Sequence, residues 1–152
     1  MATTLDASRQ YALVASAAID YTDIAAYATA AAAETFTIVE LPASTRILNV
    51  QWILNTAFVD DAAETQLMDL GFSGGGETAD PDAFTATEID IDGTLGAGEA
   101  AKSEVGYDHD YVAATNVTAT FTPSVGAAAL TAGNIDVFVT YIIESRSNEN
   151  QG

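Results

Sequence analysis

Apolar and polar side chains alternate at every second position through much of the chain, and this alternation constrains the fold more than any other feature. Successive side chains of a β-strand point to opposite faces of the sheet, so the pattern predicts strands with one buried face. Residues 46–58 show it most clearly, and residues 116–122 and 134–143 repeat it. In residues 46–58 the positions expected to point inward are Leu48, Val50, Trp52, Leu54 and Phe58, with Asn49, Gln51 and Asn55 on the other face. In residues 134–143 the inward positions are Ile135, Val137, Val139, Tyr141 and Ile143.

Four further segments, 35–41, 66–72, 85–91 and 106–112, are weaker strand candidates. Turn signals separate the candidates: Leu41-Pro42, Gly74-Gly75-Gly76, Asp80-Pro81-Asp82, Asp92-Gly93, Pro123 and Ala132-Gly133-Asn134. A parallel sheet would need crossover helices, and no segment is long enough for one. The sequence therefore predicts an all-β fold, an antiparallel β-sandwich or jelly roll with an N-terminal arm.

Residues 1–33 are rich in Ala and lack clean alternation, so we expect an N-terminal arm or edge segment there. A short helix over residues 24–33, capped by Thr22 or Asp23, fits the Ala content. The β-sandwich domain is expected over residues 34–145, and the polar residues 146–152 are expected to fray. Aromatic side chains contribute strongly to contacts between proteins, so the candidates for an arm interface are Tyr11, Tyr21 and Tyr27. The alternative is that these tyrosines pack within their own domain.

The chain carries 4 Lys and Arg against 22 Asp and Glu, a formal charge of −18. Binding to nucleic acid or to an anionic membrane needs clustered basic residues, so we expect neither partner. The apolar run 11–19 lacks the basic start of a signal peptide, and residues 25–33 are too few to span a bilayer. A strong negative charge with a single Lys favours a halophilic or marine source. Cysteine is absent, which excludes disulfides and thiolate metal sites.

Two short motifs could carry chemistry. Gly71-Phe72-Ser73-Gly74-Gly75 matches the pattern that exposes a nucleophilic serine, and His109 is the single histidine. Glycines stand where the motif needs a helix, which favours a plain glycine loop. Residues 88–99 match a twelve-residue calcium loop, with Asp90, Asp92 and Glu99 as ligands, except that Glu88 replaces the first Asp. The same letters also fit a strand with Thr87, Ile89 and Ile91 inward, and the flanks are not helical.

Other carboxylates and one glycosylation sequon indicate a function less specifically. A pair for glycoside hydrolysis could come from Asp60, Asp61, Asp80, Asp82, Asp108 and Asp110. In so acidic a chain a solvated face explains them better, and Trp52 fits the core rather than a sugar platform. Asn116-Val117-Thr118 is a glycosylation sequon, meaningful only in a secreted protein.

Three stretches, taken in order, carry a family resemblance. They are Leu41-Pro42 leading into RILNVQWILNTAFVD, then DLGFSGGGETADPDAF at 69–84, then NVTATFTP at 116–123 with ALTAGNIDVFVTYI at 129–142. This order resembles small β-sandwich structural proteins of tailed phages and tailed archaeal viruses, especially head decoration (cement) proteins. The resemblance covers residues 35–143, while the acidity and residues 1–33 depart from it.

The resemblance implies a virion protein on the capsid surface that binds the major capsid protein from outside and stabilises the shell. It implies a homotrimer and no catalytic residue, cofactor or metal. A thin core of small residues fits this role, because trimerisation would bury strand edges and apolar surface. Two alternatives stay open, namely a tail or fibre component and a carbohydrate- or calcium-binding β-sandwich module. An enzyme is the least expected class.

Overall fold

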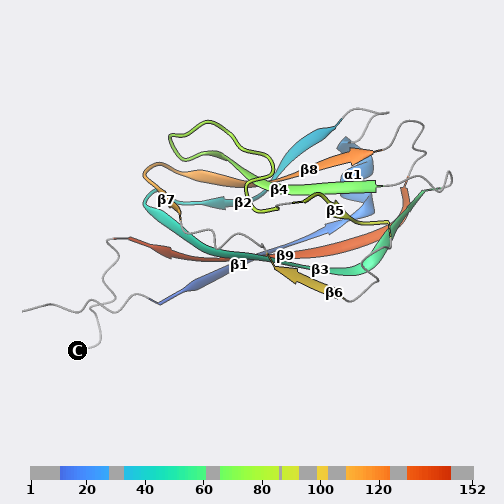
Figure 1. The fold of residues 1–152 in the computed structure, drawn as a ribbon, viewed down its shortest axis with the longest axis horizontal. Coiled ribbons are helices and arrows are strands. Elements are labelled where there is room, and N and C mark those ends of the chain that lie inside the picture. The colour runs from blue at the N-terminus through green and yellow to red at the C-terminus, as the bar shows by residue number, and fades with distance from the viewer. Residues whose placement is uncertain are drawn as a thin grey trace, which may run out of the picture.

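The computed structural model describes residues 11–27, 33–60, 66–85, 87–92, 99–102, 109–123 and 130–144. Two antiparallel sheets pack face to face as two layers, with one short helix at one end (Figure 1). Sheet A has the strand order β1-β9-β3-β6, and β7 also pairs with β3. Its strands are β1 (Leu13–Asp20), β9 (Leu130–Ile143), β3 (Thr45–Asp60), β6 (Glu99–Lys102) and β7 (His109–Tyr111). Sheet B has the order β2-β8-β4-β5, made by β2 (Glu34–Leu41), β8 (Thr115–Pro123), β4 (Gln66–Gly74) and β5 (Ile89–Asp90).

Strands near the two ends of the sequence pair with each other, and the next strands inward along the sequence pair in turn. β1 pairs with β9 in sheet A, while β2 pairs with β8 in sheet B, all antiparallel. This nesting across two sheets is the jelly-roll arrangement. The predicted all-β sandwich class is therefore confirmed.

The core lies between the two sheets and is built from the inward positions of both. The predicted inward positions of β9, from Ile135 to Val139, are fully buried, and so are Val117, Ala119 and Phe121 of β8. The rings of Phe72 and Tyr111 meet edge to face, with centroids 5.0 Å apart, which joins β4 to β7 across the layers.

Strand β3 departs from the predicted alternation near its start. Its register with β9 shifts between Ile47 and Asn49, which inserts one extra residue, Leu48, as a bulge. Ile47 is fully buried and Leu48 is 38% exposed, so the prediction that Leu48 points into the core is wrong. The bulge restores the predicted phase for the inward positions from Val50 to Phe58, which are buried.

Several strand limits differ from the predicted ones. β9 begins at Leu130, so Gly133 lies inside a strand where a turn was predicted. The candidate 85–91 forms only the two-residue β5, with Ile89 and Ile91 buried as predicted but Thr87 exposed. Of the candidate 106–112, the described part forms β7. Strands β1 and β6 were not predicted.

The helix α1 (Tyr21–Tyr27) starts earlier than the predicted 24–33. Its cap is Asp20, whose Oδ1 accepts hydrogen bonds from the N–H of Thr22 (3.1 Å) and its hydroxyl (3.0 Å). In return the N–H of Asp20 donates to Oδ2 of Asp23 (2.9 Å), a reciprocal cap. The predicted caps, Thr22 and Asp23, thus lie in the first turn.

Candidate binding surface

The centre of the outer face of sheet A has few charged residues, which distinguishes it from the rest of this acidic chain. Cross-strand partners share a face, so the registers β1·β9 and β9·β3 give the composition of this face. One row contains Val14, Thr140 and Asn49, and the next contains Ser16, Phe138 and Gln51. A third row contains Ala18, Asp136 and Ile53. Across β1, β9 and β3 these three rows hold one charged side chain, Asp136, in a chain of formal charge −18. On the edge strand β6, Lys102 is the partner of Gln51 and continues the second row.

Even this carboxylate is engaged within the face. Nδ2 of Asn55 donates to Oδ2 of Asp136 (2.8 Å) and to Oδ1 of Asn134 (2.8 Å). At the other end of the face, Arg46 lies near Asp110 (3.4 Å) and Glu144 (3.7 Å). The centre of the face is thus a mixture of amide, hydroxyl and apolar side chains. Such uncharged mixtures are typical of the centres of protein interfaces, where charged residues are depleted.

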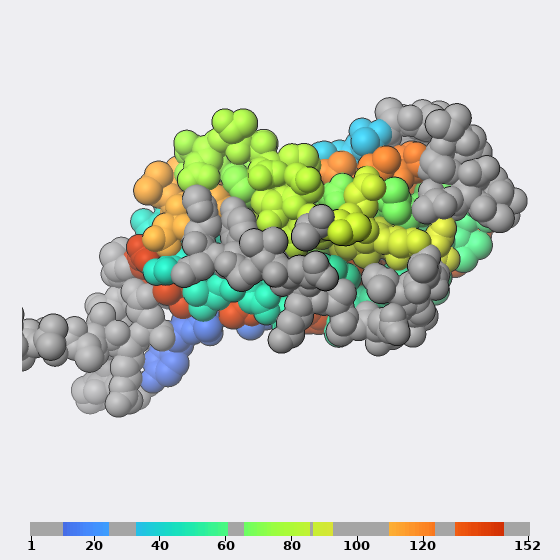
Figure 2. All heavy atoms as spheres, in the orientation of Figure 1, coloured from blue at the N-terminus to red at the C-terminus, as the bar shows by residue number. Residues whose placement is uncertain are grey.

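The opposite side of the sandwich is acidic. The loop of residues 75–85 folds on the side of sheet B, and its yellow-green atoms stand out from the body there (Figure 2). Carboxylates on this loop, on sheet B or just before β5 are Glu40, Asp69, Glu77, Asp80, Asp82 and Glu88. The two outer sides of the sandwich therefore differ sharply in charge.

Burial and neighbouring carboxyl groups raise the pKa values of three aspartates, Asp69, Asp80 and Asp92. Burial raises the pKa of the Asp69 carboxyl, although the Thr85 hydroxyl donates a hydrogen bond to it (3.1 Å). The pKa of Asp80 is raised first by the hydrogen bond with the Asp82 side chain and then by burial. The pKa of Asp92 is raised in the same way by Asp90. Each raised value means that the fold favours the protonated carboxyl.

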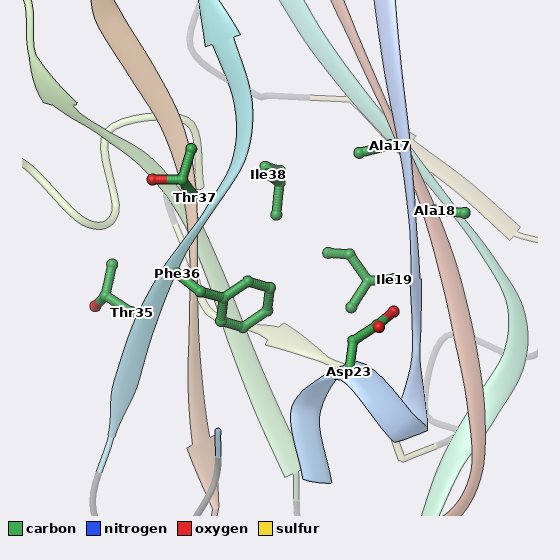
Figure 3. Close-up of a pocket in the computed structure, with 8 residues that line it drawn as sticks. All are labelled: Ala17, Ala18, Ile19, Asp23, Thr35, Phe36, Thr37 and Ile38. Atoms are coloured by element: carbon green, nitrogen blue, oxygen red, sulfur yellow. The ribbon is translucent and has the colours of Figure 1, made fainter. Parts of the chain in front are cut away.

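A groove of about 550 Å³ lies between the edge strands of the two sheets. Phe36 and Ile38 of β2 point across it toward Ala17 and Ile19 of β1, with Asp23 of α1 at one end (Figure 3). The register of β2 shifts between Thr37 and Val39, which marks a bulge at Ile38, one of the residues that line the groove. The groove is therefore lined by both apolar and polar atoms and is bordered by two strand edges.

The three predicted arm tyrosines are placed differently. Tyr11 is 62% exposed just before β1, whereas Tyr21 packs against the core. The side chain of Tyr27 lies outside the described residues. The packing of Tyr21 supports the alternative that this tyrosine serves its own domain, and the interface role of Tyr11 stays a prediction.

The serine motif lacks the geometry of a nucleophile elbow. Ser73 is near the end of β4, and its backbone carbonyl accepts a hydrogen bond from the Thr115 hydroxyl (3.2 Å). Instead of a helix, turns follow, with Gly74, Gly75 and Gly76 at positive φ. The backbone of His109 pairs with Ile47 in sheet A, whereas Ser73 belongs to sheet B. A glycine turn thus accounts for the motif.

The two ends of the candidate calcium loop belong to different sheets. Asp90 pairs with Leu67 in sheet B, while Glu99 pairs with Leu54 in sheet A. Asp90 Oδ1 accepts a hydrogen bond from the N–H of Asp92 (3.2 Å). Residues 93–98 and the side chain of Glu99 lie outside the described part. Within the described residues no three His, Cys, Asp or Glu side chains are placed to hold a metal ion.

Among the described residues, the carboxylates considered for glycoside hydrolysis are spread over the fold, apart from the neighbours Asp80 and Asp82. Asp60 is buried and accepts a hydrogen bond from Nε2 of Gln66 (3.0 Å), while Asp110 lies beside Arg46. Asp80 and Asp82 are neighbours on the acidic loop, and Asp61 and Asp108 lie outside the described residues. Trp52 is in the core, as predicted, and Asn116 is half-buried in a central strand of sheet B. In the described part of the chain, no helix has the length and apolar character needed to cross a membrane.

Neither the weakly charged face nor the groove was predicted from the sequence. The signal for the face was present in the predicted strands, because the outward positions of 46–58 and 134–143 include Asn49, Gln51, Phe138 and Thr140. No local signal could show the groove, because it forms between strands of different sheets.

Comparison with solved structures finds chains of the same fold in phage capsids. One belongs to the acidic stable capsid structure of Helicobacter pylori bacteriophage KHP30, with TM-score 0.58, 17% identity, and coverage of 88% of this chain and 89% of that one. A second belongs to the capsid asymmetric unit of cyanophage Pam1, with TM-score 0.55, 19% identity, and coverage of 94% and 92%. A third belongs to the capsid of Ralstonia phage GP4, with TM-score 0.52, 15% identity, and coverage of 93% and 90%. No protein-family model and no curated protein matches the chain.

These comparisons establish a shared fold. Each alignment covers close to nine-tenths or more of both chains, so the matched chains are similar to this one in length. The likeness therefore extends over whole small chains and is not confined to one domain of a larger chain.

Proposed function

We propose that this chain is a virion structural protein that binds the outside of a tailed-virus capsid and stabilises it, as a decoration protein without catalytic activity. The observation that carries the proposal is the fold shared, over nearly the whole length, with chains from three phage capsids. The strand and turn order that resembles head decoration proteins supports the same role. Its partner is the major capsid protein, and the resemblance implies a homotrimer.

The charge distribution supports one orientation on the shell. The centre of the outer face of sheet A, in its three rows on β1, β9 and β3, has one carboxylate, Asp136, which accepts a hydrogen bond from Asn55. This centre can therefore be buried without leaving a carboxylate unpaired. The acidic loop on the side of sheet B then faces solvent, where its negative charge keeps particles apart. We therefore assign the rows around Asn49 and Phe138 to the capsid-facing surface.

The head is a better location than the tail for this protein. All three matched structures are described as capsids, which favours docking on the head. A tail or fibre protein would share the sandwich architecture but would attach elsewhere on the particle.

A matched pair of substitutions tests the orientation. Asn49 and Asn116 are both half-buried, on the outer faces of sheets A and B respectively. Asn→Asp adds one negative charge at nearly constant shape, and burying an unpaired carboxylate in an interface is costly. Capsids of the virus that encodes the chain, stripped of it, would be mixed with each variant and sedimented.

We expect Asn49→Asp to weaken binding about tenfold, equivalent to about 1.4 kcal/mol, and Asn116→Asp to bind like the unmodified protein. Failure of the unmodified protein to sediment with the capsids would contradict the proposed function. Equal binding by the two variants would contradict only the orientation.

A further inference from the structure

Within the described residues, the outer edge of strand β1 has none of the usual protections against pairing. The strand pairs with β9 through eight consecutive residues without a register break, and no other described strand pairs with it. Residues 13–19 contain no charged residue, proline or bulge. By contrast, the neighbouring edge strand β2 has a bulge and carries Glu34 and Glu40. Natural proteins use such charges and bulges to block edge pairing, so β1 is an edge open to another strand.

The two halves of β1 have complementary shapes. The first half presents exposed apolar side chains, with Val14 63% and Leu13 36% exposed, and Tyr11 precedes them. In Figure 2 the blue atoms of this half project from the body. The second half borders the groove, whose lining includes Ala17, Ala18 and Ile19 together with Phe36 and Ile38 (Figure 3). β1 therefore has projecting apolar side chains in its first half and borders the groove with its second half.

We propose that β1 pairs antiparallel with β1 of a second copy about a two-fold axis. Such a symmetric contact is self-complementary, so it brings the apolar first half of each strand against the groove half of the other. Strand addition of this kind gains backbone hydrogen bonds and places alternate side chains in the groove.

The faces of the sheet restrict the register, and the uncharged segment of residues 13–19 is centred on Ser16. Residues opposite each other must point to the same face, so a position of the outward row opposes another outward position. With Ser16 on the two-fold axis, Val14 opposes Ala18 of the second copy and Leu13 opposes Ile19. The exposed Leu13 then enters the groove beside Ile19, and the outer face of sheet A continues across both copies.

Charge also favours a second copy at this edge. Two chains of charge −18 repel each other, and most surfaces would bring carboxylates together. From Tyr11 to Ile19 there is none, so this edge allows close approach. The contact is separate from capsid binding, and its two-fold symmetry distinguishes it from the contacts that build a trimer.

Cysteine cross-linking tests the pairing, because the chain has no cysteine of its own. A self-opposed pair in an antiparallel ladder has Cα atoms about 4.5–5.5 Å apart, within disulfide range. Ser16→Cys is therefore expected to form disulfide-linked dimers under mild oxidation. Thr37→Cys, an equally exposed position on β2, serves as the control and should remain monomeric on a denaturing gel.

The register has its own test. Val14→Cys alone should not cross-link, whereas a mixture of Val14→Cys and Ala18→Cys proteins should. Val14→Glu added to Ser16→Cys should suppress the cross-link, because it places carboxylates in the contact. Thermal unfolding of each variant confirms that these exposed substitutions leave the fold intact. The proposal is overturned if Ser16→Cys cross-links no faster than Thr37→Cys, or if Val14→Cys alone cross-links as fast as Ser16→Cys.

Discussion

Gly133 lies directly against the ring of Phe58, across the central strand pair of sheet A. A Cβ atom on Gly133 would be 2.2 Å from Cδ1 of Phe58, and the φ of Gly133 is +143°. The register of β3 and β9 is irregular here, shifting between Thr56 and Val59. Glycine allows the strand to continue past a buried aromatic ring in a conformation that other residues rarely adopt.

Gly133→Ala should be strongly destabilising, by about 3 kcal/mol, because backbone strain and overpacking against Phe58 add together. Gly76→Ala is the matched control. Gly76 also has positive φ (+84°), but its Cβ would meet only Val112 Cγ2 at 3.4 Å. The control should therefore lose about 1 kcal/mol, from strain alone. Urea unfolding measures both, and equal losses would contradict the role of the Phe58 contact.

Gly71→Ala should release the acidic loop from β4. A Cβ on Gly71 would lie 2.1 Å from the backbone oxygen of Asp80 and 2.3 Å from the carbonyl carbon of Pro81. The N–H of Phe72 also donates to the Asp80 oxygen (2.8 Å), so the loop backbone is held close to this strand. Limited proteolysis should cut the variant between residues 75 and 85 faster than the unmodified protein. An unchanged cleavage rate there would show that the loop is not held by this contact.

Stability should rise as the pH falls toward the ordinary carboxyl pKa of about 3.9. The pKa values of Asp69, Asp80 and Asp92 are raised in the folded state, by burial at Asp69 and by a neighbouring carboxyl at Asp80 and Asp92. A raised folded pKa gives a stabilisation that is complete below the unfolded pKa, about 3.9, and is lost as the pH rises through the folded value.

Asp82→Asn should flatten this pH dependence. Asp82 is the carboxyl that raises the pKa of Asp80, and its charge also raises the pKa of Asp69. The free energy of unfolding would be measured by urea titration at several pH values, with the exposed Glu40→Gln as a control that keeps the Asp80–Asp82 pair. A stability that falls steadily on acidification from pH 7 would contradict the prediction.

Calcium should not stabilise the fold. The ends of the candidate calcium loop belong to strands of different sheets, and Asp90 already accepts a hydrogen bond from the N–H of Asp92. Thermal unfolding with and without Ca²⁺ should give the same midpoint. A rise in the midpoint that disappears in Asp90→Asn or Asp92→Asn would instead support the calcium-binding alternative.

The strands that alternate between apolar and polar residues could be predicted from the sequence. The segments from Val50 to Leu54 and from Ile135 to Val139 each follow a two-residue period, and one face of each is buried. β1 was not predicted because its two faces have similar side chains. One face has Leu13, Ala15 and Ala17, and the other has Val14, Ser16 and Ala18. A strand that is apolar or small on both faces has no alternation to detect.

The irregular positions depend on partners that are distant in sequence. Leu48 is displaced outward by a register shift against β9, and Gly133 is held in a strand by its contact with Phe58. The groove likewise needs Phe36 and Ile19 to be brought together from two sheets. Local sequence carries no signal for any of these, whereas the low charge of the outer face of sheet A could be read once its strands were assigned.

The proposal that the chain binds the outside of the capsid is tested most simply by locating the chain on the virus particle. Virions of the virus that encodes the chain would be purified intact, labelled with gold-conjugated antibody against the chain, and imaged by electron microscopy. We expect gold over the outer surface of the capsid heads and none on the tails. Label confined to tails, or particles that contain no copy of the chain, would contradict it.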